Sequence, residues 1–286
     1  MSNIIIGYNN RIDLATLTGG NWTATLPRAN IQNRLISKVA RTSGDAIADA
    51  TINIDFGTTY AIGLIALVGH NISVVGKVRI RGDNAGTFAS SLYDSGWVSV
   101  WPGGVVPIEM LEWEGDNFWL GTISAAERAG FQAPFIQLNT SRTVARYWRI
   151  EVDDTTNVST YIQIGRIFMS DYWHPEINYS YGASLGYEDE TNTQKSVGGQ
   201  EFFDNATRYR VMKLQLDWIA ESEAYVQALE LQRLLGISGE LLVVPDSADL
   251  ANAIRRNFLG RLRSLATMQV ARQGRYSNSL EIKESL

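Results

Sequence analysis

The sequence has 286 residues, a net charge of -5, no cysteine and two histidines. This length suits two ordinary domains, each with a core of its own. The acidic balance gives no basic footprint for nucleic acid, and the missing cysteines exclude disulfides, thiolate nucleophiles and cysteine-ligated metals. No segment approaches the roughly 20 apolar residues of a membrane span, and the N-terminus lacks the basic region of a signal peptide. We therefore expect a protein made in a host cytoplasm that uses no membrane insertion, nucleic acid, metal or cofactor.

The first half of the chain carries the pattern of strands. Residues 1–45 are rich in residues that favour turns, and they predict an extended N-terminal arm. Polar and apolar residues alternate over 51–56, and an almost wholly apolar run follows over 61–68, as in a half-buried and a fully buried strand. A β-hairpin is predicted over 144–169 from the same alternation on both sides of a polar turn. Because a hairpin this apolar on one face has to close over a second sheet, residues 46–175 are predicted to form a β-sandwich.

A joint that contains a proline divides the chain. Pro175 follows an aromatic stretch and precedes a polar, glycine-bearing run over 178–199. Few contacts are expected to cross such a stretch, which is typical of a domain boundary. We therefore place the boundary at Pro175 and expect residues 1–175 to fold without the rest.

The second block, residues 176–286, mixes strand and helix patterns. Residues 208–218 alternate between polar and apolar side chains except at Met212, where a β-bulge is predicted. Apolar residues over 221–235 recur with a helical period, acidic residues start this stretch, and Gly236 ends it. This block is therefore predicted to be a β-sandwich or barrel that carries one α-helix.

Residues 46–175 resemble the galactose-binding-like jelly rolls, the discoidin type among them. The segments that carry the resemblance are 52–57, 67–71, 77–81, 147–150 and 164–167. The resemblance implies a jelly-roll β-sandwich whose loops at one end bind sugars, lipid headgroups or protein. Those loops vary so much within the family that no ligand residue can be carried over to this chain.

Residues 176–286 resemble the ring-forming domain of distal tail proteins in long-tailed bacteriophages. The features that carry the resemblance are the strand over 208–218, the helix, the segment 239–246 and the C-terminal strand over 280–284. The resemblance implies a virion protein that forms a ring, commonly six-fold, at the end of the tail tube and contacts other tail-tip proteins. This chain departs from the usual family order because its jelly roll comes first. The whole chain is thus predicted to be mainly β, with an N-terminal jelly roll before the ring-like domain.

No catalytic constellation emerges, so we expect no enzyme. His70 ends a predicted strand and His174 precedes a proline, and neither has the context of a catalytic triad. Asp153 and Asp154 could offer oxygen ligands to calcium, although two acids in a turn are more often only solvated. The calcium question stays open at the level of sequence.

The stretch over 103–133 has a looser pattern and reads as a long insertion with aromatic and acidic residues. Trp97 and Trp101 precede it on a strand-like segment and are assigned to the core, whereas Trp113 and Trp119 are candidate sugar-binding surface rings. Its acidic residues are Glu109, Glu112, Glu114 and Asp116. A glycosidase needs two carboxylates about 5 to 9.5 Å apart, which sequence spacing does not fix, and acids that keep an exposed loop soluble are commoner.

Exposed strand edges in the second block suit contacts with neighbouring subunits. The charged residues predicted to lie on them are Arg210, Lys213, Asp217, Glu281 and Lys283. The first functional hypothesis is therefore a structural subunit of a phage tail tip or baseplate that forms a ring and displays the jelly roll. The alternative is a carbohydrate-binding module or adhesin that contacts host surface glycans.

Overall fold

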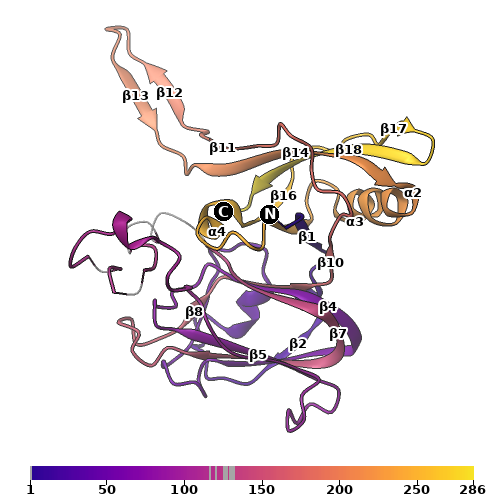
Figure 1. Cartoon of the computed structure of the whole chain (residues 1–286). Coiled ribbons are helices and arrows are strands. Elements are labelled where there is room, and N and C mark those ends of the chain that lie inside the picture. The colour runs from indigo at the N-terminus through magenta and orange to yellow at the C-terminus, as the bar shows by residue number, and fades with distance from the viewer. Residues whose placement is uncertain (1, 116, 120, 125–127, 129–132) are drawn as a thin grey trace.

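The computed structural model describes residues 2–115, 117–119, 121–124, 128 and 133–286. In these residues the chain is mainly β and its sheets are antiparallel, which confirms the predicted fold class. A β-sandwich forms the lower part of the molecule in Figure 1, and a second sheet with a helix on one face lies above it. Among the described residues, no helix is long and apolar enough to cross a bilayer.

The sandwich is built around two long, bent strands, β4 (Thr51–Val68) and β7 (Phe135–Asp153). Residues 51–55 of β4 pair with the end of β7, and residues 64–67 pair with its beginning. The register shifts between these two stretches, and Gly57 lies there with a φ of 74° that favours glycine. The pair therefore passes from one layer of the sandwich to the other.

The remaining elements of the sandwich complete these two layers. The strands are β2 (Thr16–Thr18), β3 (Ala40–Arg41), β5 (Lys77–Asp83), β6 (Tyr93–Ser99), β8 (Gln163–Ile164) and β9 (Arg166–Ser170). The short 3₁₀ turns are η1 (Arg11–Leu14), η2 (Arg28–Gln32) and η3 (Ile108–Met110). One sheet has the order β2-β4-β7-β5-β6 with β9 on the other side of β4, and β3 pairs with β8. The buried core between the layers includes Ile65, Val78, Ile80, Trp148 and Ile150.

The hairpin predicted over 144–169 was wrong in its pairing. Both arms are strands, but β7 pairs with β4 and β5, whereas β9 pairs with the far half of β4. The connection between them carries β8 and the buried residues Asp154 and Asn157, so it is a packed crossing and not a tight turn. Alternation identifies strands but does not determine their partners.

The second sheet contains eight strands from both ends of the chain. They are β1 (Ile5–Tyr8), β10 (Tyr172–Trp173), β11 (Ser184–Glu188), β14 (Tyr209–Ala220), β15 (Glu240–Val244), β16 (Phe258–Leu262), β17 (Gln269–Arg272) and β18 (Arg275–Glu284). Their order is β10-β1-β15-β16-β18-β14-β11, and β17 pairs with β18. The predicted N-terminal arm therefore contains a strand of the second sheet, because β1 pairs with β15.

This pairing bears on the expectation that residues 1–175 fold alone. Such a fragment would keep β1 and β10 but lose β15, which binds β1 through four residue pairs. Its independence stays a prediction, and the unpaired edge of β1 is what the fragment would expose to water.

The predicted helix is present over 221–235. It consists of α2 (Glu221–Glu223), a π-helical segment η4 (Ala224–Leu229) and α3 (Glu230–Leu235), and the short helix α4 (Ala253–Arg256) lies further on. The apolar face of the helix over 221–235 is buried on the sheet, and Gly236, with a φ of 52°, ends this helix. The bulge predicted at Met212 lies instead between Leu216 and Ile219, where Trp218 has a φ of 63°, and Met212 stays in register with Ile282.

Both faces of the second sheet are covered, and alternate residues of β15 point into the two covering layers. Leu241 and Val243 point into the core beneath the helix, whereas Leu242 and Val244 belong to a cluster shared with the sandwich. Gly7 lies at the close approach of the two parts, since a Cβ there would come within 2.5 Å of the Leu64 side chain. The two parts therefore share a hydrophobic layer.

A buried arginine connects the same two parts. Arg166 of β9 is fully buried, and its Nη2 lies 2.6 Å from an Oε2 atom of Glu240 in β15 and 2.7 Å from Asp13 Oδ1. Its Nη1 donates to the carbonyl of Ile31 at 3.2 Å. The buried charge of Arg166 is tolerated because the guanidinium keeps these partners. Removing Arg166 would leave a carboxylate buried without its cation and should lower the free energy of unfolding.

We predict that Arg166→Met lowers the free energy of unfolding by about 3 kcal/mol, because Glu240 is left buried without its cation. Denaturant unfolding followed by tryptophan fluorescence and circular dichroism measures the change. The control is Arg79→Met, whose partner Asp94 lies at 2.6 Å in an exposed pair and which should cost less than about 1 kcal/mol. Equal losses in the two variants would contradict a connecting role for Arg166.

Candidate functional site

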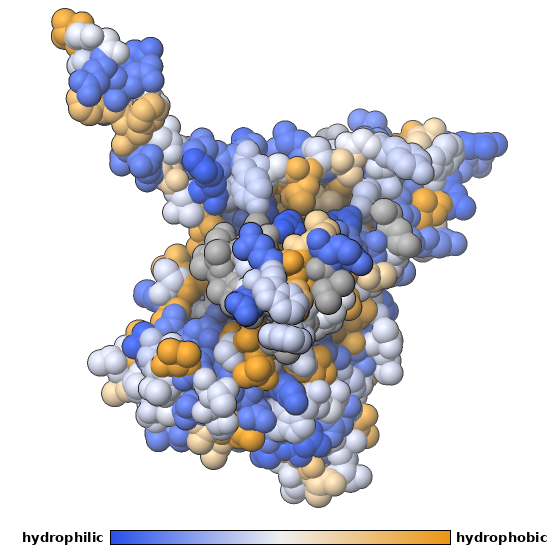
Figure 2. Space-filling view, turned by 60° about the vertical axis from the view of Figure 1, so that its left-hand side comes forward, coloured by the Kyte–Doolittle hydropathy of each residue, from blue (hydrophilic) through white to orange (hydrophobic). Residues whose placement is uncertain are grey.

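A hairpin extends from the second sheet away from the body of the protein. It is formed by β12 (Asn192–Lys195) and β13 (Glu201–Asp204), which pair only with each other among the described strands. We call residues 188–208 the arm; it points to the upper left in Figure 1 and stands clear of the body, with apolar atoms at its tip, in Figure 2.

The arm exposes two aromatic rings that a stable monomer would normally bury. Phe202 is 56% exposed and Phe203 is 59% exposed. Successive residues of a strand point to opposite faces, so the arm presents a ring on each face. A two-stranded hairpin is only marginally stable in water, and covering either face would stabilise it.

The sequence prediction treated most of this region as a polar linker. The signal that could have found the hairpin is Gly198–Gly199 between two short runs, since paired glycines are typical of hairpin turns. Across the turn, the Ser196 N–H donates to the Gln200 carbonyl at 2.8 Å, and the Gln200 N–H donates to Ser196 Oγ at 3.1 Å.

Two of the predicted assembly residues, Arg210 and Lys213, lie where their strand has a partner on both sides. Strand β14 pairs with β18 along most of its length and with β11 over residues 209–213, and β18 pairs with β16 and β17 on its other side. Arg210 is almost fully buried, forms an ion pair with Glu284, and donates to the carbonyl of Ile254 at 2.8 Å. The interpretation of Arg210 as a surface contact is therefore corrected: it stabilises the interior of one subunit.

The other four predicted assembly residues are on the surface and have partners within the subunit. Lys213 lies 3.1 Å from Glu281, and Lys283 lies 2.9 Å from Glu190 at the base of the arm. The carboxylate of Asp217 accepts hydrogen bonds from Ser180 and Gln215. These contacts hold the four side chains against their own subunit. Their role in contacts with a neighbouring subunit stays a prediction.

The two candidate sugar-binding rings lie together. Trp113 is 72% exposed and Trp119 is 83% exposed, and their ring centroids are 6.4 Å apart. Phe118 contacts both, with centroid distances of 4.9 Å to Trp113 and 5.3 Å to Trp119. The structure thus forms one exposed aromatic cluster from these three residues.

The two tryptophans assigned to the core differ from each other. Trp97 is 41% exposed, so its assignment to the core was wrong, whereas Trp101 packs against the core and donates from Nε1 to the Ile72 carbonyl at 2.9 Å. Asp116, one of the four acids considered for a glycosidase pair, lies outside the described residues. Glu109, Glu112 and Glu114 are exposed.

Asp154 has a structural role in the loop after β7. Its carboxylate accepts hydrogen bonds from the Ser73 backbone N–H at 2.8 Å and from the Asn157 side chain at 2.7 Å. Within the described ranges, no group of three or more histidine, cysteine, aspartate or glutamate residues could hold a metal ion. The Ser73 hydroxyl donates to the other oxygen of Asp154, so both oxygen atoms of this carboxylate are engaged by the protein itself.

His70 lies close to this loop and is held in its neutral form. Burial lowers the pKa of His70 to about 4, and the nearby Asp154 offsets only part of this effect. Its Nδ1 is buried and has no hydrogen-bond partner among the described residues, although part of the side chain remains accessible. Its ring packs edge-on against Trp101, with a centroid distance of 5.8 Å. Protonation of the His70 ring is therefore disfavoured in the folded protein.

We predict that the protein loses stability as the pH falls from about 6.5 to about 4, because the unfolded chain binds a proton at His70 that the folded chain excludes. The loss from this group is roughly 3 kcal/mol and is complete below the folded pKa. Urea unfolding across this range should show a shallower pH dependence for His70→Phe, which keeps the contact with Trp101. Parallel curves for the two proteins would show that His70 titrates normally.

No protein-family model and no curated protein matches this sequence. Several solved structures are distantly similar to it. They include the lectin-binding domain of lectinolysin complexed with Lewis b, with 12% identity and a TM-score of 0.38 over 58% of this chain and 97% of that chain. A family 32 carbohydrate-binding module of Clostridium perfringens NanJ in complex with galactose has 12% identity and a TM-score of 0.38, over 58% and 99% of the two chains.

A fucose-binding module of Streptococcus pneumoniae is similar at 9% identity, with a TM-score of 0.35 over 57% of this chain and 95% of that chain. Similarity at this level gives neither a ligand nor a residue role. More than half of this chain is distantly similar in structure to these carbohydrate-binding modules.

Proposed function

We propose that this chain is a structural subunit of a multi-copy assembly, the tail tip or baseplate of a long-tailed bacteriophage. In this proposal the second domain forms a ring at the distal end of the tail tube and the jelly roll is displayed on it. The tail setting, the contacts with tail-tip proteins and the six-fold ring come from the resemblance of the second domain to distal tail proteins. The subunit has no catalytic role.

The observation that supports assembly is the arm. Phe202 and Phe203 are more than half exposed on a hairpin that stands clear of its own subunit. Exposed apolar surface of this kind is typical of an interaction site, and burying both rings would repay the cost of ordering the hairpin. The partner we propose is another copy of this chain.

The opposite end of the same sheet has chemistry that complements the arm. The arm carries five acidic and two basic side chains, whereas residues 264–275, which include β17, carry two arginines and no acid. Exposed apolar residues lie at that end too, among them Tyr225, Val226 and Val270. The ring of Tyr225 meets that of Tyr276 edge to face, and Tyr276 pairs with Val270 across the strands, so these side chains belong to one surface.

Contact between opposite ends of one sheet is head-to-tail. Such a contact closes into a ring when the rotation between neighbouring copies allows it. Since the arm is net acidic and residues 264–275 are net basic, a contact between these two segments is also expected to weaken as the salt concentration rises.

We predict that Phe202→Ser combined with Phe203→Ser weakens self-association by about 1,000-fold, because buried aromatic anchors contribute on the order of 2 kcal/mol or more each when an interface forms. Sedimentation velocity over a concentration series and electron microscopy of the assembled particles measure it. Val158→Ser, which changes an exposed residue of the jelly roll, is the matched control and should assemble like the wild type. Assembly by the double variant at wild-type concentrations would contradict the role of the arm.

A second candidate function is sugar binding, and one observation favours it. The exposed cluster of Trp113, Phe118 and Trp119 offers flat apolar rings of the kind that stack on the C–H face of a pyranose. The similarity to sugar-binding modules is too distant to support this proposal, so the proposal rests on the three exposed aromatic rings. A host surface glycan would be the partner.

We predict that any glycan signal is lost in a variant with Trp113→Ala and Trp119→Ala, since each stacked ring is worth about 1 kcal/mol or more. A glycan array comparing this variant with the wild type measures the loss, and Trp97→Ala is the control for a half-exposed tryptophan elsewhere in the jelly roll. A signal that persists in the double variant would exclude this cluster. If neither the wild type nor the variants gave a glycan signal, only the structural role would remain as a proposal.

A further inference from the structure

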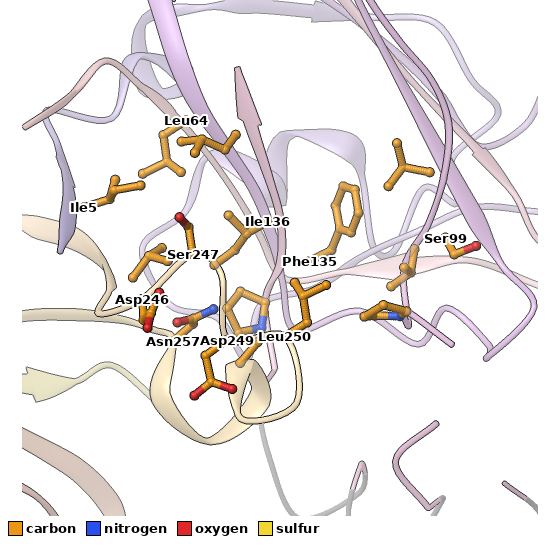
Figure 3. Close-up of a pocket in the computed structure, with 17 residues that line it drawn as sticks. Ile5, Leu64, Ser99, Phe135, Ile136, Asp246, Ser247, Asp249, Leu250 and Asn257 are labelled. Atoms are coloured by element: carbon orange, nitrogen blue, oxygen red, sulfur yellow. The ribbon is translucent and has the colours of Figure 1, made fainter. Parts of the chain in front are cut away.

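Two cavities at the junction of the sandwich and the second sheet differ in their polar groups. The first, of about 280 Å³, has a mainly apolar wall, and Figure 3 shows Asp246 and Asp249 on one side of it. Both carboxylates already have partners in the chain. Asp246 accepts from the Ser2 N–H at 3.0 Å, and Asp249 is paired with Arg256 at 2.7 Å. The second cavity, of about 320 Å³, contains polar side chains for which the described residues supply no such partners.

Segments from both parts of the molecule form the wall of this second cavity. Tyr60 and Ala61 of β4 belong to the sandwich, whereas Tyr8 ends β1 of the second sheet, and Gln227 lies on the helix over 221–235. The strands β1 and β4 and the helix α3 meet at this junction in Figure 1. A cavity between two domains that has aromatic walls and a few polar groups is typical of a small-molecule site.

The backbone is irregular at three points around this cavity. Asn9, in its wall, has a φ of 63°, and Arg142, whose guanidinium lies over the ring of the wall residue Tyr172, has a φ of 48°. Gln227 belongs to the π-helical segment η4, and its Oε1 accepts a hydrogen bond from the Tyr8 hydroxyl at 2.7 Å. Left-handed residues other than glycine and π-helical segments are uncommon, and they occur often at functional sites. Three such irregularities around one cavity favour a binding role for it.

Arg11 brings a positive charge to the wall that no carboxylate of the described residues balances. Its guanidinium lies over the ring of Tyr60, 4.6 Å from the centroid, and it forms no ion pair or hydrogen bond within that part of the chain. Arg11 is only partly buried, so a molecule in the cavity can reach it. Stacking on an aromatic ring uses a face of the guanidinium, and its N–H edge stays suited to the two oxygens of a carboxylate.

The acids near the cavity have arginine partners of their own. Burial raises the pKa of Tyr8, and the negative charges of Asp171 and Glu230 raise it further, so both acids lie close to this wall. Asp171 is paired with Arg142 at 3.3 Å, and Glu230 is paired with Arg233. Together with the unpaired arginine of η1, these side chains carry an excess of positive charge.

We propose that this cavity binds a small carboxylate with an aromatic body. The carboxylate lies on the N–H edge of Arg11, and the side-chain amides of Asn9 and Gln227, which donate no hydrogen bond to the described residues, donate to it. The aromatic body packs against the rings of Tyr60 and Tyr172. An amine of the same shape would bring its charge against the guanidinium and be repelled. This site is separate from the arm and from the exposed aromatic cluster.

The test titrates the full chain with three probes that share one aromatic body. They are 3-phenylpropanoate, the neutral 3-phenylpropanamide and the cationic 3-phenylpropylamine. We expect calorimetry to show binding of the carboxylate, binding of the amide that is weaker by about tenfold or more, and none of the amine.

A pair of variants tests the guanidinium. Arg11→Met keeps an unbranched side chain over Tyr60 but removes the charge, and it should weaken 3-phenylpropanoate binding by about tenfold or more, because hydrogen bonds between charged groups are the stronger ones. Arg34→Met removes an exposed arginine outside the cavity wall and should leave binding unchanged.

A further variant separates a binding role of Asn9 from a structural one. Asn9→Gly removes the amide at a φ of 63° that glycine adopts freely, so the protein should unfold at about the wild-type temperature or above while it binds 3-phenylpropanoate more weakly. Thermal unfolding without a probe checks that each variant is folded. The proposal is overturned if the wild type does not bind 3-phenylpropanoate, if the amine binds equally well, or if folded Arg11→Met or Asn9→Gly binds as tightly as the wild type.

Discussion

The buried contact between Arg166 and Glu240 fixes how the two halves of this protein are joined. An arginine of the sandwich that is fully buried has to keep its carboxylate partner, and that partner lies on the second sheet. The shared layer formed by residues such as Leu64, Phe168 and Leu242 surrounds this pair with apolar packing. The chain is therefore two domains by architecture, but one continuous body by its packing.

Much of the fold could be predicted from local patterns. The alternation over 208–218, the helix over 221–235 and the strands of the sandwich are all present, because burial on one face of a strand or helix leaves a period in the sequence. Strand partners leave no such period. For this reason β1 was predicted to belong to an extended N-terminal segment, although it pairs with β15. For the same reason Arg210 was predicted to lie at a sheet edge, although its strand has neighbours on both sides there.

The candidate surfaces were predictable to different degrees. Trp113 and Trp119 were found because a large aromatic residue in a polar loop has few ways to be buried. The arm was missed because its aromatic pair, Phe202 and Phe203, breaks the alternation of a half-buried strand by exposing a ring on both faces. A strand with both faces exposed does not follow the pattern of a strand that covers its own core.

The measurement that tests the role of the arm most directly is a cross-link. The chain contains no cysteine, so Val197→Cys at the exposed tip of the arm provides one site for a photo-activated cross-linker and keeps both phenylalanines. Peptide mapping should place the cross-links on residues 264–275 or on the helix over 221–235 of another copy. Cross-links found only within the same chain, in particles that are fully assembled, would contradict the account.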